Sequence, residues 1–337
     1  MSLLPLYVND GKPALELSGT QVAAVRDFNE KVDSGEYRLV ANPCLCGGMA
    51  DNGDWLISEK DRYGIPIRIV LCQHCGLVRS DPNLDQQSTA KFYDSEYRRI
   101  YSGQSHASAE IFEEQKKRGL LLLDILGGHV NLAMIKKVFE VGCGAGGILY
   151  SFREAGKEVG GCDYGQEYLR YGREKGLTLY CGDIDSTGIA KESRDLLILS
   201  HVLEHFPAPA REISSLLDYL KPGGYLLLEV PGVMNIFRVY FRPIMYFQNA
   251  HVFNYYRKAL FLFLESLGLE IINGNEHARF LCRKPINPRQ ISTNPSWRKK
   301  LGGQAMKVLS SLIVLRYFWW LNPYWLLSVM RRKKSGQ

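Results

Sequence analysis

A short glycine-rich run is the feature of this sequence that most restricts its fold. Residues 138–147 read Val-Phe-Glu-Val-Gly-Cys-Gly-Ala-Gly-Gly, an apolar stretch followed by glycines at every second position. The stretch predicts a buried strand, and residues 148–155 predict the helix that follows the loop. A glycine loop between a strand and a helix lets the backbone approach a ligand and directs the first amides of the helix at it.

The central sequence continues as an alternation of strands and helices. Strand-like apolar runs lie at 159–162, 195–200 and 225–230. Helix-like runs lie between and around them, at 148–155, 211–220 and 258–267. Continuous apolar runs are typical of strands that are buried on both faces of a parallel sheet. The sequence therefore predicts a doubly wound α/β fold, and the turn Asn273-Gly274-Asn275 predicts a final hairpin.

Two acidic residues beside the loop indicate what it binds. Glu140 lies in the strand before the loop, where a carboxylate favours a cationic ligand. Asp163 ends the next strand, where it can accept hydrogen bonds from ribose hydroxyls. The glycines alone also fit the G-x-G-x-x-G pattern of dinucleotide enzymes, so a hydride-transfer enzyme stays open at this point.

With these motifs the sequence resembles the class I S-adenosylmethionine-dependent methyltransferases over about residues 105–284. The resemblance continues through Asp195–His205 and through the turn Lys221-Pro222-Gly223-Gly224. It implies a seven-stranded Rossmann-like sheet with the strand order 3-2-1-4-5-7-6, and it makes hydride transfer the weaker interpretation. The cofactor-binding residues that it implies are Glu140, Gly142, Gly144, Gly146, Asp163, Asp183, Ile184 and Ser200.

Four cysteines predict a metal site ahead of this domain. They form the pairs Cys44-Leu45-Cys46 and Cys72-Gln73-His74-Cys75, and a glycine follows each pair. Two close thiol pairs can offer four sulfur atoms tetrahedrally to zinc, with no open position for catalysis. We therefore predict a structural zinc ion, with unmetallated or redox-active thiols as the alternative. The other cysteines are expected in the core: Cys143, Cys162, Cys181 and Cys282.

The order of parts gives a predicted domain organisation and a closer resemblance. We expect a leader and zinc module at 1–104, the cofactor-binding domain at 105–284 and a basic, aromatic-rich tail at 285–337. This arrangement, with Tyr93 and Tyr97 between module and domain, resembles bacterial sugar C-methyltransferases and related enzymes of polysaccharide clusters. Residues 249–254 resemble the Glu-His segment of that group, but Ala250 replaces the glutamate. O-methylation of a glycan is therefore as open as C-methylation.

Methyl transfer requires an aligned acceptor and, for a hydroxyl or carbon acceptor, removal of a proton. Histidine suits this role because it titrates near neutral pH. The candidate bases are His251, His201, which follows the fourth predicted strand, and His205. For each of them a structural role is the alternative. Tyr97 and Tyr101 are candidates for lining the acceptor pocket.

The tail carries the positive charge of the chain. Residues 277–337 contain thirteen Lys and Arg and no acidic residue, whereas the total net charge is +7, so the remainder is net −6. An acidic body argues against nucleic acid as a partner. Residues 308–330 are mostly apolar but contain Arg316 and Asn322-Pro323, which are costly in a bilayer interior. We predict a tail that lies on an anionic membrane surface; packing on its own catalytic domain or on a second subunit is the alternative.

Together these features predict an enzyme that transfers a methyl group from S-adenosylmethionine to a sugar or glycan, in polysaccharide or nucleotide-sugar biosynthesis. Two alternatives stay open: methylation of a small metabolite or quinone-like lipid, and a non-catalytic zinc-bearing binding module. Residues 1–10 lack the features of a secretion signal. The expected location is therefore the cytoplasm, with peripheral contact at the inner face of the membrane.

Overall fold

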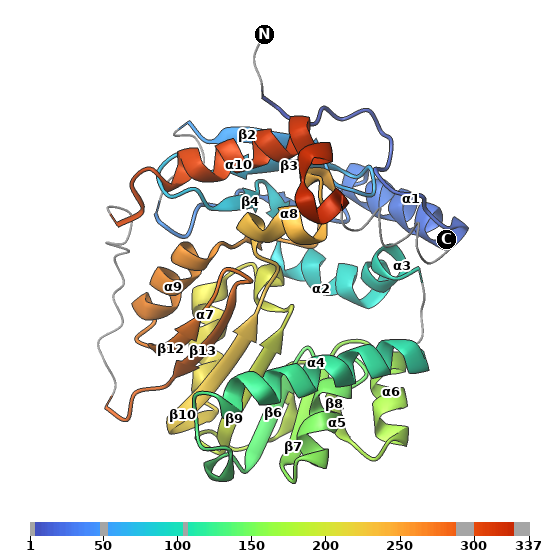
Figure 1. Ribbon diagram of the computed structural model, residues 1–337. Coiled ribbons are helices and arrows are strands. Elements are labelled where there is room, and N and C mark those ends of the chain that lie inside the picture. Colours follow the sequence, from blue (N-terminus) through green and yellow to red (C-terminus); the bar gives the residue numbers. More distant parts are fainter. Residues whose placement is uncertain (1–3, 48–52, 104–106, 288–299, 327–337) are drawn as a thin grey trace. The chain divides into compact units, whose positions relative to one another are not determined.

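The computed structural model describes residues 4–47, 53–103, 107–287 and 300–326, and the chain divides into two compact units (Figure 1). Unit 1 comprises Met1–Thr89, Pro231–Leu262 and Asn294–Gln337, and unit 2 comprises Ala90–Val230 and Phe263–Thr293.

These units do not follow the expected boundaries at 104/105 and 284/285. Residues 231–262 belong with the N-terminal segment because strand β11 (Phe253–Asn254) pairs with strand β4 (Val78–Ser80). Such pairing between distant parts of the chain leaves no periodic signal in the sequence. Helices α2 (Gln86–Ser95) and α9 (Arg257–Ser266) carry the chain across the division between the units.

Unit 2 is built on a seven-stranded, mostly parallel sheet. Its strands are β6 (Lys137–Val141), β7 (Glu158–Asp163), β8 (Thr178–Cys181), β9 (Arg194–Ser200), β10 (Leu220–Glu229), β12 (Glu270–Gly274) and β13 (Arg279–Arg283). They lie in the order β12-β13-β10-β9-β6-β7-β8, which is 6-7-5-4-1-2-3 in chain order, or 3-2-1-4-5-7-6 from the other edge. β13 is antiparallel to both of its neighbours.

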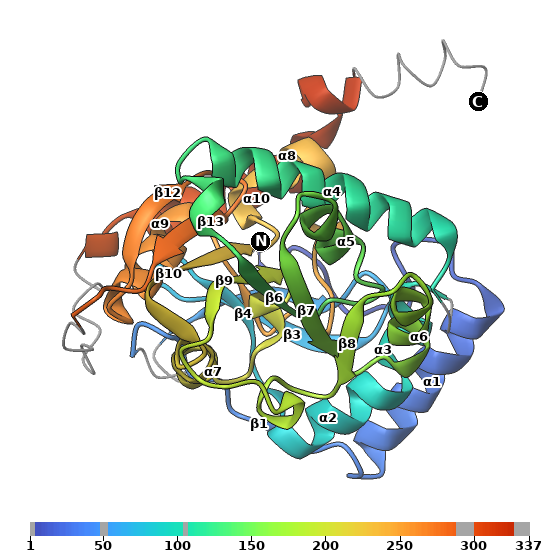
Figure 2. The same cartoon turned by 90° about the horizontal axis from the view of Figure 1, so that it is seen from below.

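Helices cover both faces of this sheet, with α4 and α5 on one side and α7 on the other (Figure 2). The helices of unit 2 beyond those at its boundaries are α3 (Tyr97–Tyr101), α4 (Ala109–Gly127), α5 (Gly147–Glu154), α6 (Gln166–Glu174) and α7 (Pro209–Leu217), with 3-10 turns η1 (Leu132–Met134), η2 (Asp185–Thr187) and η3 (Leu203–His205). α4 begins at an N-cap, where the Ser108 hydroxyl accepts a hydrogen bond from the Ile111 amide. α4 packs tightly on α5, since a Cβ at Gly119 would lie 2.8 Å from the Ile148 carbonyl oxygen.

Unit 1 contains a smaller, four-stranded antiparallel sheet in the order β11-β4-β3-β2. Its further strands are β2 (Trp55–Lys60) and β3 (Pro66–Leu71), and β1 (Leu39–Val40) pairs separately with β5 (Asn83–Leu84). Its helices are α1 (Gly19–Asp33), α8 (Ile236–Val239) and α10 (Gln304–Phe318), with 3-10 turns η4 (Val233–Asn235), η5 (Pro243–Met245) and η7 (Trp319–Leu321).

Helix α10 shows what part of the tail does. Ala305, Val308, Leu309, Leu312 and Leu315 are buried along one side of it. A Cβ at Gly76 of the same unit would lie 3.0 Å from the Ala305 Cα atom. This part of the tail therefore packs along this side on unit 1, the unit that contains the four predicted zinc ligands. Among the described residues, no helix is long and apolar enough to cross a membrane.

Candidate functional site

The glycine loop connects β6 to α5 and needs its glycines for conformation and for space. Gly142, Gly144 and Gly146 all have positive φ angles, of 71°, 55° and 78°, which L-residues with side chains rarely adopt. A Cβ at Gly142 would lie 2.4 Å from a methyl carbon of Val202, and one at Gly146 would lie 2.7 Å from Leu177. The loop backbone is therefore held close to the ends of the neighbouring strands.

Glu140 lies in β6, one residue before the strand ends, and is 1% exposed. Its Oε2 atom is buried and has no hydrogen-bond partner. Burial raises the pKa of Glu140 well above its ordinary value, and the nearby carboxylates of Asp163 and Glu229 raise it further. A buried carboxyl group with an unsatisfied oxygen fits a cationic group bound beside the loop.

Asp163 ends β7 and is held by three donors. Its Oδ2 accepts a hydrogen bond from the Gly144 amide at 2.9 Å, and its Oδ1 accepts from the Gly165 amide at 2.7 Å. The Arg98 guanidinium donates to Oδ1 at 2.6 Å and lies 3.9 Å from the centre of the Tyr168 ring. The acid predicted to bind ribose is thus fixed against the glycine loop.

The next two strands end in a charged cluster of unit 2. Glu229 at the end of β10 accepts from the Ser200 hydroxyl at 2.8 Å, from Arg118 at 2.9 Å and from Arg279 at 2.8 Å. Burial alone would raise the pKa of Glu229, but Arg118, His201 and Arg279 lower it to about 2. Ser200, predicted to contact the cofactor, is therefore already bonded to a buried, ionised carboxylate.

Two arginines of unit 2 that bond to site carboxylates, Arg98 and Arg118, were not predicted from the sequence. Arg118 lies in α4, where an arginine is typical of a solvated helix face. Arg98 lies in a polar stretch without a recognisable motif. Their hydrogen-bond partners are distant in the sequence: Asp163 lies 65 residues after Arg98, and Glu229 lies 111 residues after Arg118.

Asp183 and Ile184, two of the predicted cofactor-binding residues, follow β8. Asp183 is exposed, and its Oδ1 accepts from the Ser186 amide at 2.9 Å. Ile184 is 3% exposed. The two side chains therefore offer one polar and one apolar group at the end of a third parallel strand.

Two candidate bases of unit 2 lie beside the same carboxylate. His201 and His205 both lie near Glu204, with nitrogen–oxygen distances of 3.4 Å and 3.9 Å. His201 has a φ of 57° and accepts a short hydrogen bond from Arg118 at Nε2. His205 packs edge-on against Tyr93 and Tyr97, with ring centres 5.9 Å and 5.7 Å apart.

His251 belongs to unit 1 and is 3% exposed. Its ring accepts a hydrogen bond from the side-chain amide of Gln248 and lies edge-on to Tyr246, with ring centres 6.2 Å apart.

The two tyrosines predicted to line the acceptor pocket stack on each other. They are Tyr97 and Tyr101, and Tyr101 is half exposed.

The four predicted metal ligands form a buried cluster in unit 1. Cys44, Cys46, Cys72 and Cys75 place their sulfur atoms within 4.8 Å of one another. The Cys44–Cys75 and Cys46–Cys72 sulfur distances are 3.4 Å and 3.8 Å. Sulfurs bound tetrahedrally to zinc lie about 3.8 Å apart, given a Zn–S bond of about 2.3 Å. The residues present therefore fit zinc, and all four thiols are free of disulfides.

The turns around the cluster have the form that a metal knuckle needs. Gly47 and Gly76 have φ angles of 77° and 75°. Their amides donate to the Cys44 and Cys72 carbonyl oxygens at 2.9 Å and 2.8 Å. The Leu77 amide lies 3.5 Å from the Cys75 sulfur and donates to it.

Arg79, fully buried in unit 1, follows the second knuckle. Its guanidinium donates to Asp54 at 2.6 Å and to the Asn42 carbonyl oxygen at 2.7 Å. Burial opposes its charge, but Cys44, Asp54 and Asp81 raise the pKa of Arg79. A buried cation near Cys44 would offset negative charge on that sulfur atom.

Of the remaining cysteines, Cys143, Cys162 and Cys282 are buried, as expected for core residues. Cys181 is exposed, so its prediction as a core residue was wrong. It is the last residue of β8, at the edge of the sheet, where no further strand covers it among the described residues.

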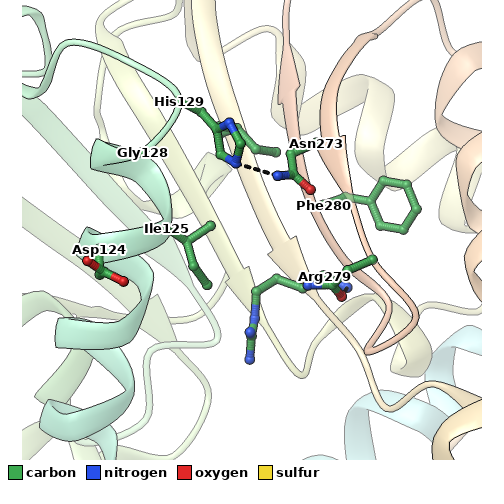
Figure 3. Close-up of a pocket in the computed structure, with 9 residues that line it drawn as sticks. Asp124, Ile125, Gly128, His129, Asn273, Arg279 and Phe280 are labelled. Carbon is green, nitrogen blue, oxygen red and sulfur yellow. Dashed lines mark hydrogen bonds between the residues drawn. The ribbon is translucent and has the colours of Figure 1, made fainter.

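A pocket of about 250 Å³ lies elsewhere in unit 2, between the end of α4 and the β12–β13 hairpin (Figure 3). Its walls include Asp124, His129, Asn273 and Arg279, and His129 bonds to Asn273. None of the predicted cofactor-binding or catalytic residues lines it. The glycine loop and the pocket are therefore separate features.

A parallel sheet with a glycine loop after its first strand and an acid at the end of its second defines a nucleoside-binding α/β protein. The sequence model of a protein family described as a methyltransferase domain matches residues 139–228. This segment, which contains the loop, Asp163 and Ser200, is therefore similar to a methyltransferase domain.

Known relatives share part of the chain. A ubiquinone biosynthesis O-methyltransferase of Stutzerimonas stutzeri is 32% identical over 108 residues, which are 30% of this chain and 46% of the relative. One of Proteus mirabilis is 35% identical over 101 residues, 28% and 41% of the two chains. The chain thus spans less than half the length of these relatives. A solved SAM-dependent methyltransferase of Archaeoglobus fulgidus is 19% identical, covers 64% of this chain and 90% of its own, and has a TM-score of 0.40.

Proposed function

We propose that this protein transfers a methyl group from S-adenosylmethionine to a hydroxyl of a small acceptor of the quinone-like, phenolic class. The observation that carries the cofactor assignment is the buried, unpartnered Oε2 of Glu140 beside the glycine loop. The acceptor class is favoured by the relatives, which are named for ubiquinone biosynthesis. When bound, the cofactor supplies a methyl group activated by a sulfonium centre.

The residues of unit 2 have distinct proposed roles. Glu140 binds the ammonium group of the cofactor, and the amides of the loop surround its amino acid part. Asp163 binds the ribose, and Arg98 keeps its carboxylate oriented. Asp183 and Ile184 flank the adenine. Arg118 and Ser200 form the adjoining wall through their bonds to Glu229.

The proton of the acceptor hydroxyl must be removed by a base. His201 is the weaker candidate because its Nε2 already accepts a hydrogen bond from Arg118. We assign the base to His205 or His251. Asparagine substitutions separate them, since loss of the base lowers kcat by about 100-fold or more and leaves cofactor affinity unchanged.

Calorimetric titration with S-adenosylhomocysteine tests the cofactor site. Wild type is expected to bind with micromolar affinity, and Asp163→Ala to bind at least about tenfold more weakly because two hydrogen bonds to ribose are lost. Asp218→Ala is the matched control, because Asp218 is an exposed partner of Lys191. No binding by folded wild-type protein would reject the methyltransferase proposal.

Transfer of a labelled methyl group to panels of acceptors tests the acceptor class. Label in phenols and hydroquinones supports the proposal. Label in nucleotide sugars or lipid-linked glycans supports the second candidate, a sugar or glycan methyltransferase. The four-cysteine cluster in unit 1 favours this candidate, because the sugar enzymes that the sequence resembles carry such a module. Binding of S-adenosylhomocysteine without transfer to any panel would favour the non-catalytic binding module.

We also propose that the four cysteines hold a structural zinc ion. The cluster contains four sulfur ligands and is fully buried. A site with no position for water suits a structural ion better than a catalytic one.

A further inference from the structure

The last described part of unit 1 presents two different sides. α10 is followed by η7 and by a further helical turn that the structure describes to Leu326. On one side of α10 the side chains are buried, among them Leu312 and Leu315. The other side, with the turn after it, leaves large apolar side chains in solvent.

Between Leu312 and Leu326, Arg316 and Asn322 interrupt the apolar sequence, and both face the protein. The Arg316 Nε donates to the Leu6 carbonyl oxygen at 3.2 Å, and its guanidinium lies 4.8 Å from the centre of the Tyr7 ring. Asn322 is 7% exposed, and its amide donates to the Phe237 carbonyl oxygen. The groups that would oppose contact with hydrocarbon are therefore satisfied inside unit 1.

The exposed side chains are apolar or aromatic and lie within ten residues of one another in the sequence. They are Tyr317 (38% exposed), Phe318 (50%), Trp320 (47%), Leu321 (65%), Tyr324 (40%) and Leu326 (45%). Ring centres of Phe318 and Trp320 lie 5.9 Å apart, and those of Trp319 and Trp325 lie 4.9 Å apart. We call these six exposed residues the aromatic surface.

Positive charge borders the aromatic surface. Arg238 lies over the Tyr324 ring at 5.4 Å, and Arg242 over the Trp319 ring at 6.0 Å. The sequence continues with Arg331, Arg332, Lys333 and Lys334, and residues 277–337 contain no acidic residue. Trp and Tyr rings prefer the depth of lipid headgroups, and basic residues are attracted to anionic lipids.

We infer that the aromatic surface of unit 1 docks on an anionic lipid bilayer and inserts to headgroup depth. The segment lies on the bilayer and does not cross it, since its inner side is occupied by unit 1. The inference rests on the exposed side chains and the charges around them, and it holds whichever acceptor the enzyme uses.

Co-sedimentation of the full chain with lipid vesicles tests the inference. Wild type is expected to bind vesicles that contain phosphatidylcholine and phosphatidylglycerol, and to bind them more weakly at high salt. It is expected not to bind vesicles of pure phosphatidylcholine. Trp320→Ser with Leu321→Ser is expected to lower the partition coefficient at least about tenfold. The matched control is Met134→Ser with Ile286→Ser, two exposed apolar residues of unit 2 (71% and 64%).

Single substitutions at Leu321 separate lipid contact from misfolding. Leu321→Glu and Leu321→Lys remove the same apolar group, but only glutamate is repelled by anionic lipid, so Glu is expected to bind more weakly than Lys. Thermal melting shows that each variant is folded. The inference is overturned if wild type ignores anionic vesicles or if the double variant binds as wild type does. It is equally overturned if sedimentation shows a dimer that Leu321→Glu dissociates, because a second copy then covers this surface.

Discussion

Two buried carboxyl groups at the carboxyl ends of parallel strands in unit 2 have opposite pKa shifts. Burial raises the pKa of Glu140, and no cation contacts its Oε2. Glu229 is as deeply buried, but Arg118 and Arg279 bond to it and its pKa falls to about 2. The protein therefore neutralises Glu229 internally, whereas the Oε2 of Glu140 has no hydrogen-bond partner among the described residues.

Glu140→Gln is expected to stabilise the free protein and to weaken cofactor binding. The raised pKa means that wild-type stability falls as pH rises above the unfolded value of 4.5, and glutamine removes this loss. A cationic ligand favours ionised Glu140, so wild type is expected to release a proton on binding S-adenosylhomocysteine. Calorimetry in buffers of different ionisation enthalpy measures this release.

The glutamine variant should bind without that proton release and with a smaller dependence on pH. Glu154→Gln, at a surface ion pair with Lys116, is the control and should leave both binding and proton release unchanged. Equal proton release by Glu140→Gln and wild type would contradict the assigned role.

Glu229→Gln is expected to lower the free energy of unfolding by about 2–4 kcal/mol at neutral pH, because Arg118 and Arg279 lose a buried counter-charge. The folded-state pKa of about 2 lies below the ordinary 4.5. Ionised Glu229 thus stabilises the fold above pH 4.5, and this contribution is lost as pH falls through about 2.

Urea unfolding between pH 6 and pH 2 measures this difference, with pH values chosen to span the two pKa values of about 4.5 and about 2. The difference in the free energy of unfolding between wild type and Glu229→Gln should become smaller as the pH falls across this range. Glu192→Gln, at an exposed pair with Lys284, should change stability by less than about 0.5 kcal/mol. A gap that stays constant down to pH 2 would show that the arginines do not act through the charge of Glu229.

At the scale of elements, the two cysteine knuckles depend on the strands and helix around them. The second knuckle lies between β3 and β4, and the Tyr256 hydroxyl donates to the Cys75 carbonyl oxygen. Gly76 has a positive φ and lies against α10. The cluster thus joins segments of unit 1 that are far apart in sequence.

Purified protein is expected to contain about one zinc ion per chain, and removal by a strong chelator is expected to lower the melting temperature of unit 1. Cys72→Ser should lose the metal and the stability together. Cys181→Ser is the control, because Cys181 is exposed and lies outside the cluster. Full stability of metal-free wild type would favour the alternative of unmetallated thiols.

At the scale of the whole molecule, α10 completes unit 1 from the far end of the sequence. Leu312 is 1% exposed and Val314 is 54% exposed. Leu312→Ala is expected to cost about 2–5 kcal/mol, and Val314→Ala less than about 0.5 kcal/mol. Hydrogen exchange read residue by residue should show faster exchange in unit 1, including β2 to β4. Loss of protection spread equally over unit 2 would show that the two units unfold together.

The sequence predicted what local patterns determine. Continuous apolar runs and one glycine loop predicted the sheet of unit 2, and spacing alone predicted the cysteine cluster that the structure forms. It could not predict the return of residues 231–262 to unit 1, since β11 contributes only two residues to the pairing. Arg98 and Arg118 were not predicted either, because each forms an ion pair with a carboxylate that is distant in the sequence and close only in the folded protein.

The discontinuous layout of unit 1 has a consequence for how the chain is made. The ribosome synthesises all of unit 2, which lies within residues 90–293, before it synthesises α10. Folding of unit 2 can therefore begin during translation, whereas unit 1 stays incomplete until its last segment has been made.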